Sequence, residues 1–460
     1  MADFEKDLEY AVKELKIEFS FSDYQLRAMK SLYENKDTIA VLPTGSGKSL
    51  IFQTLPWLLQ GKMAADRPMI VLVISPLNSL MQDQVISLCE RGISACYISI
   101  DASTVTTCAE VEETKYESEE CSDEEMDKKL KTSAGIESIK NGHFNIIYLH
   151  PETVFVKEIG KLLRSSVFRG RVCCTVIDEV HMVAEWGSDF RQSFNRLGEL
   201  TCLFPRVPHL AVTATATPSA LEELIALLQF KNCTKVLANP DRPNIYLEKK
   251  ERLPNIHKFE KYDLIMSEVL AQLKDKYIDF PVTIMHCDNL ESLGYCFQLL
   301  CHELGTRAYF PESSTLPEDR IVAQFHKDYT ERMKIHIISE LRKQNPKVRL
   351  VLATVALGMG LNAPSIATVI HMRPPTTLEK YMQEIGRAGR NGKPAKALCY
   401  FNTSDIAKNR KGLDNAMRAY IQNTDKCLRL HLVGHFGYNS VLFSGEKAMC
   451  CSNCKVTSAD

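Results

Sequence analysis

Short apolar runs rich in β-branched residues alternate with amphipathic helical stretches along this chain. In the first half these runs are Thr38–Leu42, Ile70–Ile74, Asn145–Tyr148, Val172–Ile177 and Leu210–Thr213. Strands of this kind separated by helices predict a parallel sheet that is covered on both faces. The pattern then restarts with Val282–Met285, Val348–Ala353, Ala367–His371 and Ala397–Tyr400, so we expect a second α/β lobe.

The boundaries between the expected domains follow from prolines and from a change of composition. Two prolines in Asn239–Pro243 disfavour regular secondary structure, so we expect the boundary between the two lobes there. We therefore expect one lobe over residues 1–238 and a second over 239–404. A small helical, cysteine-bearing subdomain is expected over 405–460.

Composition excludes some classes of protein. The 460 residues are 45% apolar and 25% charged, which is ordinary for a globular chain of about two to four domains. The sequence lacks the run of about 18 apolar residues that a membrane helix needs, and its charged N-terminus does not resemble a signal peptide. The net charge of −1 neither supports nor excludes a nucleic-acid partner, because ten acidic residues gather between Glu110 and Asp127. We interpret that stretch as a solvated loop, and the alternative is a partner-binding tail.

A glycine-rich loop, LPTGSGKS at Leu42–Ser49, stands between an apolar run and a helical one. Glycines let backbone N–H groups approach a phosphate, and the N-terminal end of the next helix favours an anion. Lysine and serine at the end of such a loop contact the β/γ-phosphates and a Mg²⁺ ion. A chance turn is the alternative, but the strand before it and the helix after it argue against chance. We expect ATP to bind at Thr44, Gly45, Ser46, Gly47, Lys48 and Ser49.

An acidic pair, Asp178 and Glu179 in the sequence DEVH, comes at the end of the apolar run Val172–Ile177. Ligands of open α/β sheets bind at the carboxyl ends of the strands. We expect Asp178 to hold Mg²⁺ together with Ser49, and Glu179 to orient and deprotonate the attacking water. His181 either couples this site to the rest of the lobe, which we favour, or is a packed core histidine.

Further motifs resemble the RecQ family of superfamily 2 DNA helicases, from about Phe19 to Cys454. FSDYQ (Phe21–Gln25) is similar to a motif in which the glutamine reads the adenine edge, which implies that role for Gln25. SPLNSLMQDQV (Ser75–Val85) and YLHPE (Tyr148–Glu152) resemble elements that grip a single DNA strand. The resemblance implies two RecA-like lobes.

AEWGSDFRQSFNRLG (Ala184–Gly198) resembles the aromatic-rich loop of RecQ enzymes, which implies DNA contacts for Trp186, Phe190 and Arg191. An aromatic ring can stack on an unpaired base for about 1–3 kcal/mol. The alternative is that these aromatic residues belong to the core, which we favour for Phe194.

QEIGRAGRNG (Gln383–Gly392) matches motif VI of the family closely, and segments such as ATVALGMGLNAP (353–364) and DRPNIY (241–246) resemble its neighbours. Two arginines three residues apart are expected on one helical face. The resemblance implies that Arg390 is an arginine finger for the nucleotide, that Arg387 supports it and that Gln383 senses the nucleotide. A solvated surface helix is the alternative. HCDNL (286–290) departs from the family, as does Thr315–Lys347, much of which we expect to be helical.

The last cysteines differ from the other cysteines of the chain. The sequence has 16, and most stand singly in apolar surroundings, as reduced core thiols do. The spacing of four of them instead resembles that of the RecQ zinc-binding subdomain, in the paired-cysteine form of the Werner helicase. These are Cys427, Cys450, Cys451 and Cys454, and the resemblance implies that they bind a structural Zn²⁺. A frayed tail with reduced thiols is the alternative, and adjacency makes Cys450 the weakest candidate.

The function implied by the resemblance is an ATP-dependent DNA helicase that moves 3′ to 5′, in repair or recombination, on single-stranded and 3′-tailed duplex DNA. A nuclear location follows from that substrate. We expect weak unwinding as an alternative, because a winged-helix domain does not follow the cysteines. An RNA helicase and a DNA-binding module without motor activity are further alternatives, but DEVH and the intact Lys48, Glu179 and Arg390 argue against them.

Overall fold

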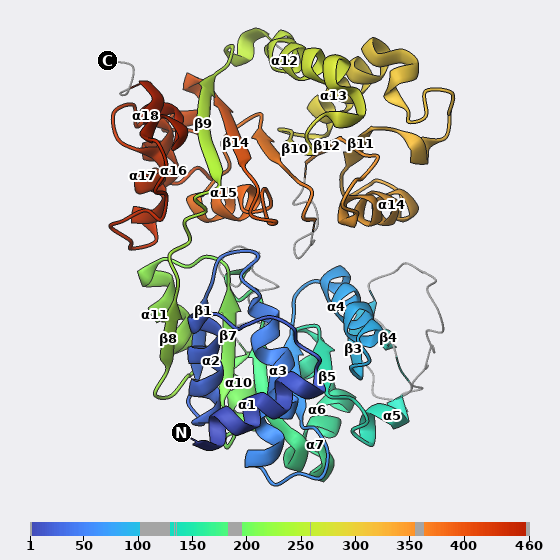
Figure 1. Ribbon diagram of the computed structural model, residues 1–460, viewed down its shortest axis with the longest axis vertical. Coiled ribbons are helices and arrows are strands. Elements are labelled where there is room, and N and C mark those ends of the chain that lie inside the picture. Colours follow the sequence, from blue (N-terminus) through green and yellow to red (C-terminus); the bar gives the residue numbers. More distant parts are fainter. Residues whose placement is uncertain are drawn as a thin grey trace, which may run out of the picture. The chain divides into compact units, whose positions relative to one another are not determined.

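The computed structural model describes residues 2–101, 129–132, 134, 136–182, 196–257, 259–354 and 363–456. The chain divides into two compact units, Met1–Ala238 and Asn239–Asp460, which we call lobe 1 and lobe 2 (Figure 1). Among the described residues, none of the helices is long and apolar enough to cross a membrane.

Lobe 1 is built on an eight-stranded sheet in the order β4-β3-β5-β2-β6-β7-β1-β8. Every pair in it is parallel except β3 with β4 at one edge. The strands are β1 (Thr38–Val41), β2 (Ile70–Ile74), β3 (Ala95–Asp101), β4 (Lys129–Thr132), β5 (Ile146–Leu149), β6 (Val172–Ile177), β7 (His209–Thr213) and β8 (Thr234–Leu237).

Successive residues of the lobe 1 strands enter two different cores. Val71 and Val73 pack with one group of helices, whereas Ile70, Leu72 and Ile74 pack with the other. This alternation follows from the period of two of a β-strand. One face is covered by α1 (Ala2–Glu14), α2 (Asp23–Tyr33), α3 (Lys48–Lys62) and α4 (Asn78–Glu90), and the other mainly by α6 (Lys157–Leu163), α7 (Ser166–Arg171), α10 (Gly198–Leu203) and α11 (Pro218–Leu227).

Lobe 2 is built on a six-stranded, all-parallel sheet in the order β11-β12-β10-β13-β14-β9. Its strands are β9 (Ile245–Glu251), β10 (Thr283–His286), β11 (Val322–Phe325), β12 (Leu350–Ala353), β13 (Thr368–His371) and β14 (Ala395–Phe401). The segment Thr315–Lys347, much of which was expected to be helical, contains α14 (Glu331–Arg342) and also strand β11. The strand was not predicted, because pairing with β12 decides the conformation of so short a run.

The lobe 2 sheet is also covered on both faces (Figure 1). Helices α12 (Glu260–Lys276) and α13 (Leu290–Leu304) pack on one face. The other face is covered by α14, α15 (Leu378–Ile385), α16 (Asn415–Gln422) and α17 (Leu428–His435). The tail cysteines pack in the same core, and the last of them, Cys454, lies on α18 (Ser452–Val456). The predicted pair of covered parallel sheets is therefore confirmed.

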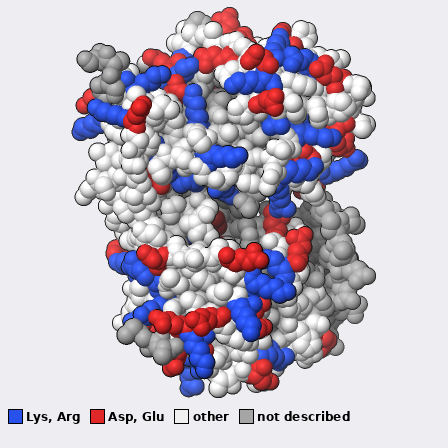
Figure 2. Space-filling view, in the orientation of Figure 1, with Lys and Arg blue, Asp and Glu red and all other residues white. Residues whose placement is uncertain are grey.

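Charged side chains are mixed over the described surface. Figure 2 shows Lys and Arg interspersed with Asp and Glu on the visible face of each lobe. This mixture agrees with the net charge of −1. The visible face thus gives no electrostatic argument for one class of partner.

Candidate active site

The phosphate loop, residues 42–49, joins β1 to α3 in lobe 1. Gly45 and Gly47 have φ angles of 83° and 73°, in the left-handed region that favours glycine. Gly47 is the N-cap of α3, so the positive end of this helix dipole lies at the loop. The ammonium of Lys48 donates to the carbonyls of Leu42, at 3.1 Å, and Pro43, at 3.4 Å. The loop therefore has the backbone geometry and the cation that a phosphate site needs.

Gln25 is bound to this loop by its amide group. Its Nε2 donates to the carbonyls of Ser46, at 3.1 Å, and Gly47, at 3.2 Å, while its Oε1 accepts from the backbone N–H of Ser22 at 2.8 Å. Ser22 is the N-cap of α2 and completes a capping box with Gln25. This role of Ser22 was not predicted, although the spacing S-x-x-Q before a helix signals a capping box.

Asp178 and Glu179 follow β6, at the carboxyl end of the lobe 1 sheet. The Asp178 N–H donates to the carbonyl of Ile74, so the pair lies beside the end of β2 as well. Burial raises the pKa of the Asp178 carboxyl to about 7, and Glu179 acts in the same direction, whereas the Lys48 ammonium opposes the rise. A buried carboxylate that needs further positive charge is suited to a Mg²⁺ ion. Glu179 has a φ of 50°, an unusual angle of the kind that clusters at functional sites.

His181 lies between the acidic pair and the segment that follows β7. Its Nδ1 is 3.3 Å from Glu179 Oε2 and 2.9 Å from the hydroxyl of Thr213, which in turn bonds to the backbone of Thr215. Burial lowers the pKa of His181, so the ring is neutral at neutral pH. This contact joins DEVH to the segment Thr213–Thr215 at the end of β7, and the coupling role of His181 stays a prediction.

Several candidate residues lie outside the described part of the chain. These are the proposed DNA-contacting residues Trp186, Phe190 and Arg191, the neighbouring Phe194, most of the segment 353–364 and the acidic stretch from Glu110 to Asp127.

Motif VI of lobe 2 begins on α15 and ends beyond it. Gln383 lies on α15, whereas Arg387 and Arg390 belong to the turns that follow, which we call the arginine loop (residues 386–391). The expectation that both arginines share one face of a regular helix was therefore wrong. Gly389 has a φ of 60°, and its N–H donates to the carbonyl of Ile366, so the chain leaves the helical path.

Two residues from the start of lobe 2 hold the arginine loop. The guanidinium of Arg242 donates to the carbonyls of Gly386, Ala388 and Gly389 at 3.2, 3.1 and 2.9 Å. Asn244 Nδ2 donates to the carbonyl of Gly389 at 2.8 Å. The contact of the DRPNIY segment (241–246) with motif VI was not predicted from the sequence, where the segment was only a family match.

A group of two histidines and one glutamate lies beside motif VI. His371 Nε2 is 2.8 Å from Glu384 Oε2, and the His286 ring stacks on His371 with centroids 4.8 Å apart. Burial lowers the pKa of His286 to about 3, and the cations Arg387 and Lys380 act in the same direction. Because cations already surround this buried group, we interpret it as a structural network rather than a metal site.

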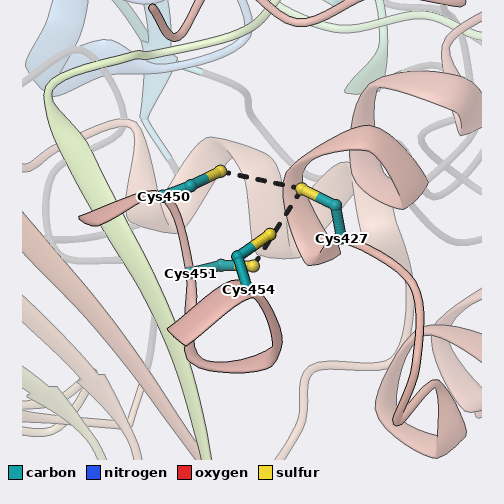
Figure 3. A group of neighbouring side chains, drawn as sticks. All are labelled: Cys427, Cys450, Cys451 and Cys454. Atoms are coloured by element: carbon teal, nitrogen blue, oxygen red, sulfur yellow. Dashed lines mark hydrogen bonds between the residues drawn. The ribbon is translucent and has the colours of Figure 1, made fainter. Parts of the chain in front are cut away.

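The four tail cysteines come together in lobe 2 (Figure 3). Their sulfur atoms lie within 4.8 Å of one another, with 3.6 Å between Cys427 and Cys450 and 4.0 Å between Cys427 and Cys451. Four sulfur atoms bound tetrahedrally to one Zn²⁺ lie about 3.8 Å from one another, whereas the two sulfur atoms of a disulfide lie about 2 Å apart. Contacts with the thiols of Cys427 and Cys450 lower the pKa of the Cys451 thiol, and so does the backbone N–H of Leu428, which donates to its sulfur at 3.4 Å. The donor set and spacing therefore fit Zn²⁺, and they include Cys450, the weakest candidate.

Comparison with known proteins gives matches to both lobes. The DEAD/DEAH box helicase family matches residues 22–224, and the helicase conserved C-terminal domain matches residues 301–392. The chain is 30% identical over 457 residues to ATP-dependent DNA helicase Q-like 2 of Arabidopsis thaliana, covering 96% of this chain and 56% of that protein. It is 29% identical over 452 residues to ATP-dependent DNA helicase Q1 of Rattus norvegicus, covering 94% of this chain and 62% of that protein.

Among solved structures, the helicase Lhr of Mycobacterium smegmatis, bound to single-stranded DNA and AMP-PNP, matches with a TM-score of 0.60 at 16% identity. The match covers 95% of this chain and 51% of that chain. This likeness concerns the fold, and it confirms the expected pair of RecA-like lobes. The chain spans 56% and 62% of the length of the two curated relatives.

Proposed function

This chain belongs to the RecQ family of DNA helicases, and we propose that it couples ATP hydrolysis to 3′-to-5′ movement along single-stranded DNA. The observation that carries the proposal is the joint geometry of lobe 1. The phosphate loop with Lys48 and the acidic pair, of which Asp178 is buried and Glu179 half-buried, lie at the carboxyl ends of β1 and β6, and the Lys48 ammonium acts on the pKa of Asp178. This is the arrangement that phosphoryl transfer to water requires.

Each residue of the site has a proposed task. The phosphate loop and Lys48 hold the β- and γ-phosphates, and Gln25 contacts the adenine. Ser49 and Asp178 would hold Mg²⁺, which neutralises charge on the phosphates. Glu179 takes a proton from the attacking water, and Arg387 and Arg390 stabilise charge on the transferring group, with Gln383 sensing the nucleotide.

We propose that the same chain contacts DNA through Trp186, Phe190 and Arg191, and that Cys427, Cys450, Cys451 and Cys454 hold a structural Zn²⁺. The proposed substrates are single-stranded DNA and 3′-tailed duplexes. From the proposed DNA substrate we also propose that the protein acts in the nucleus, in repair or recombination.

The test compares ATP hydrolysis with and without single-stranded DNA, with single-stranded RNA as a matched cofactor. Strand displacement is measured in parallel on 3′-tailed and 5′-tailed duplexes. We expect stimulation by DNA and displacement of the 3′-tailed substrate. Stimulation by RNA and not by DNA would identify an RNA helicase. A rate of ATP hydrolysis that neither nucleic acid changes would contradict the proposal.

A further inference from the structure

Arg429, on α17 of the cysteine-rich tail, is one of the most deeply buried charged residues in the described chain, with 2% of its side chain exposed. Its guanidinium donates to Asp241 Oδ1 at 2.6 Å and to the carbonyl of Arg242 at 2.8 Å. It also donates to the carbonyls of Ile245, at 2.5 Å, and Cys450, at 3.3 Å. One side chain of the tail therefore binds the segment that opens lobe 2 at three successive points.

The carboxylate of Asp241 is held from both sides. Oδ1 accepts from Arg429, and Oδ2 accepts from the backbone N–H groups of Leu442, at 2.6 Å, and Phe443, at 3.3 Å. The Phe443 ring also lies 5.2 Å from the Arg429 guanidinium. A buried charge pair with this many satisfied hydrogen bonds defines the position of the backbone that carries it.

The residue next to Asp241 is Arg242, whose guanidinium donates to three carbonyls of the arginine loop. Fixing residues 241 and 242 from the tail therefore fixes the anchor of that loop. We infer that Arg429 and Asp241 are positioning residues for the arginine loop, so that the cysteine-rich tail controls the rate of ATP hydrolysis. This inference rests on the proposed function, in which Arg387 and Arg390 act on the transferring phosphoryl group.

A purely stabilising role is the alternative, and lobe 2 offers a matched control for it. Arg252 and Asp405 form a second buried ion pair, 2.8 Å apart, with side chains 1% and 0% exposed. This pair also contacts Asn255, Asn402 and Arg373, and none of these belongs to the segment 241–245. Replacing either aspartate takes the nearest carboxylate away from a buried arginine, so the damage to stability should be comparable.

The experiment compares Asp241→Asn with Asp405→Asn in the full chain, at a temperature where both are folded. We expect Asp241→Asn to lower kcat for DNA-stimulated ATP hydrolysis by about 10- to 100-fold, because small misplacements of catalytic groups have effects of that size. KM for ATP should not change, because the loss is confined to the transition state. Asp405→Asn should leave kcat close to that of the wild type.

Hydrogen exchange gives a readout that does not depend on turnover. The N–H groups of Gly389 and Gly392, which donate to Ile366 and Gly389, should exchange faster in Asp241→Asn than in Asp405→Asn. Equal kcat and equal exchange in the two variants would overturn the inference. If Asp241→Asn does not fold, Arg429→Lys replaces it, because lysine keeps the charge but loses the planar fork of donors. A wild-type chain without ATPase activity would refute the proposed function, and the exchange comparison would still decide the positioning claim.

Discussion

The phosphate loop of lobe 1 and the arginine loop of lobe 2 are held in place differently. The phosphate loop is held from within the first 50 residues, by the positive φ angles of its glycines and by Gln25. The arginine loop is held by Arg242 and Asn244, more than 140 positions earlier in the chain, and through them by Arg429. One loop is thus a product of local sequence, and the other is a product of tertiary structure.

This difference has consequences for mutations. A substitution in the phosphate loop should remove a chemical group and leave the fold intact. A substitution around the arginine loop should change stability and chemistry together, because the same contacts serve both.

Lys48→Ala should abolish ATP hydrolysis while single-stranded DNA affinity and thermal stability remain close to those of the wild type. The ammonium donates to the carbonyls of Leu42 and Pro43, which belong to the phosphate loop itself, so these contacts are local to that loop. Steady-state ATPase, a DNA-binding titration and a melting curve give the three readouts. Lys36→Ala, which removes an exposed lysine from the same lobe, is the control. Substantial hydrolysis by the Lys48 variant would refute the site assignment.

Cys454→Ser should release the metal from lobe 2 and lower the stability of that lobe. The effect on stability should be larger than any direct effect on ATP hydrolysis. Structural Zn²⁺ contributes about 10–16 kcal/mol of apparent binding energy in small peptides. The control is Cys399→Ser, which changes a fully buried thiol in the same core. We expect one zinc per chain in the wild type and in the control, and close to none in Cys454→Ser, by elemental analysis. Wild-type protein without zinc would remove the metal site from the proposal.

The same distinction explains how much could be predicted from the sequence. Strands β2 and β6 coincide with the predicted ranges, because continuous β-branched runs specify buried parallel strands. The positions of Lys48 and Asp178 follow from motifs that adjoin such strands. By contrast, β11 is a four-residue run whose conformation depends on its partner β12. The bond between Arg429 and Asp241 joins residues 188 positions apart, which a local pattern does not reveal.

Gly389→Ala should reduce kcat more than its cost in stability suggests. An added Cβ would lie 2.4 Å from Asn244 Nδ2 and 2.8 Å from the Cβ of Ala395, so the contact that holds the arginine loop would have to move. Gly392→Ala is a matched control, because its φ is also positive, at 77°, but its Cβ would meet nothing within 4 Å. Both variants should lose about 1–2 kcal/mol from the left-handed conformation. Only Gly389→Ala should also lower kcat, by about 10- to 100-fold. Equal kcat values in the two variants would show that the contact with Asn244 does not matter for chemistry.

Ser22→Ala should produce the smallest effect, and it tests whether the hold on the phosphate loop is as local as the comparison suggests. The hydroxyl of Ser22 caps α2 and also donates to Gln25 Oε1 at 3.2 Å, and the amide of Gln25 bonds to Ser46 and Gly47. Loss of an N-cap hydroxyl costs about 0.5–2 kcal/mol. Ser165→Ala removes the corresponding hydroxyl from the N-cap of α7 in the same lobe and should cost a similar amount. Only Ser22→Ala should also raise KM for ATP and weaken the preference for ATP over GTP, because Gln25 is less well fixed. If KM for ATP rises equally in both variants, the capping box does not hold Gln25 in place. The position of the phosphate loop then depends on parts of lobe 1 that make no hydrogen bond to it.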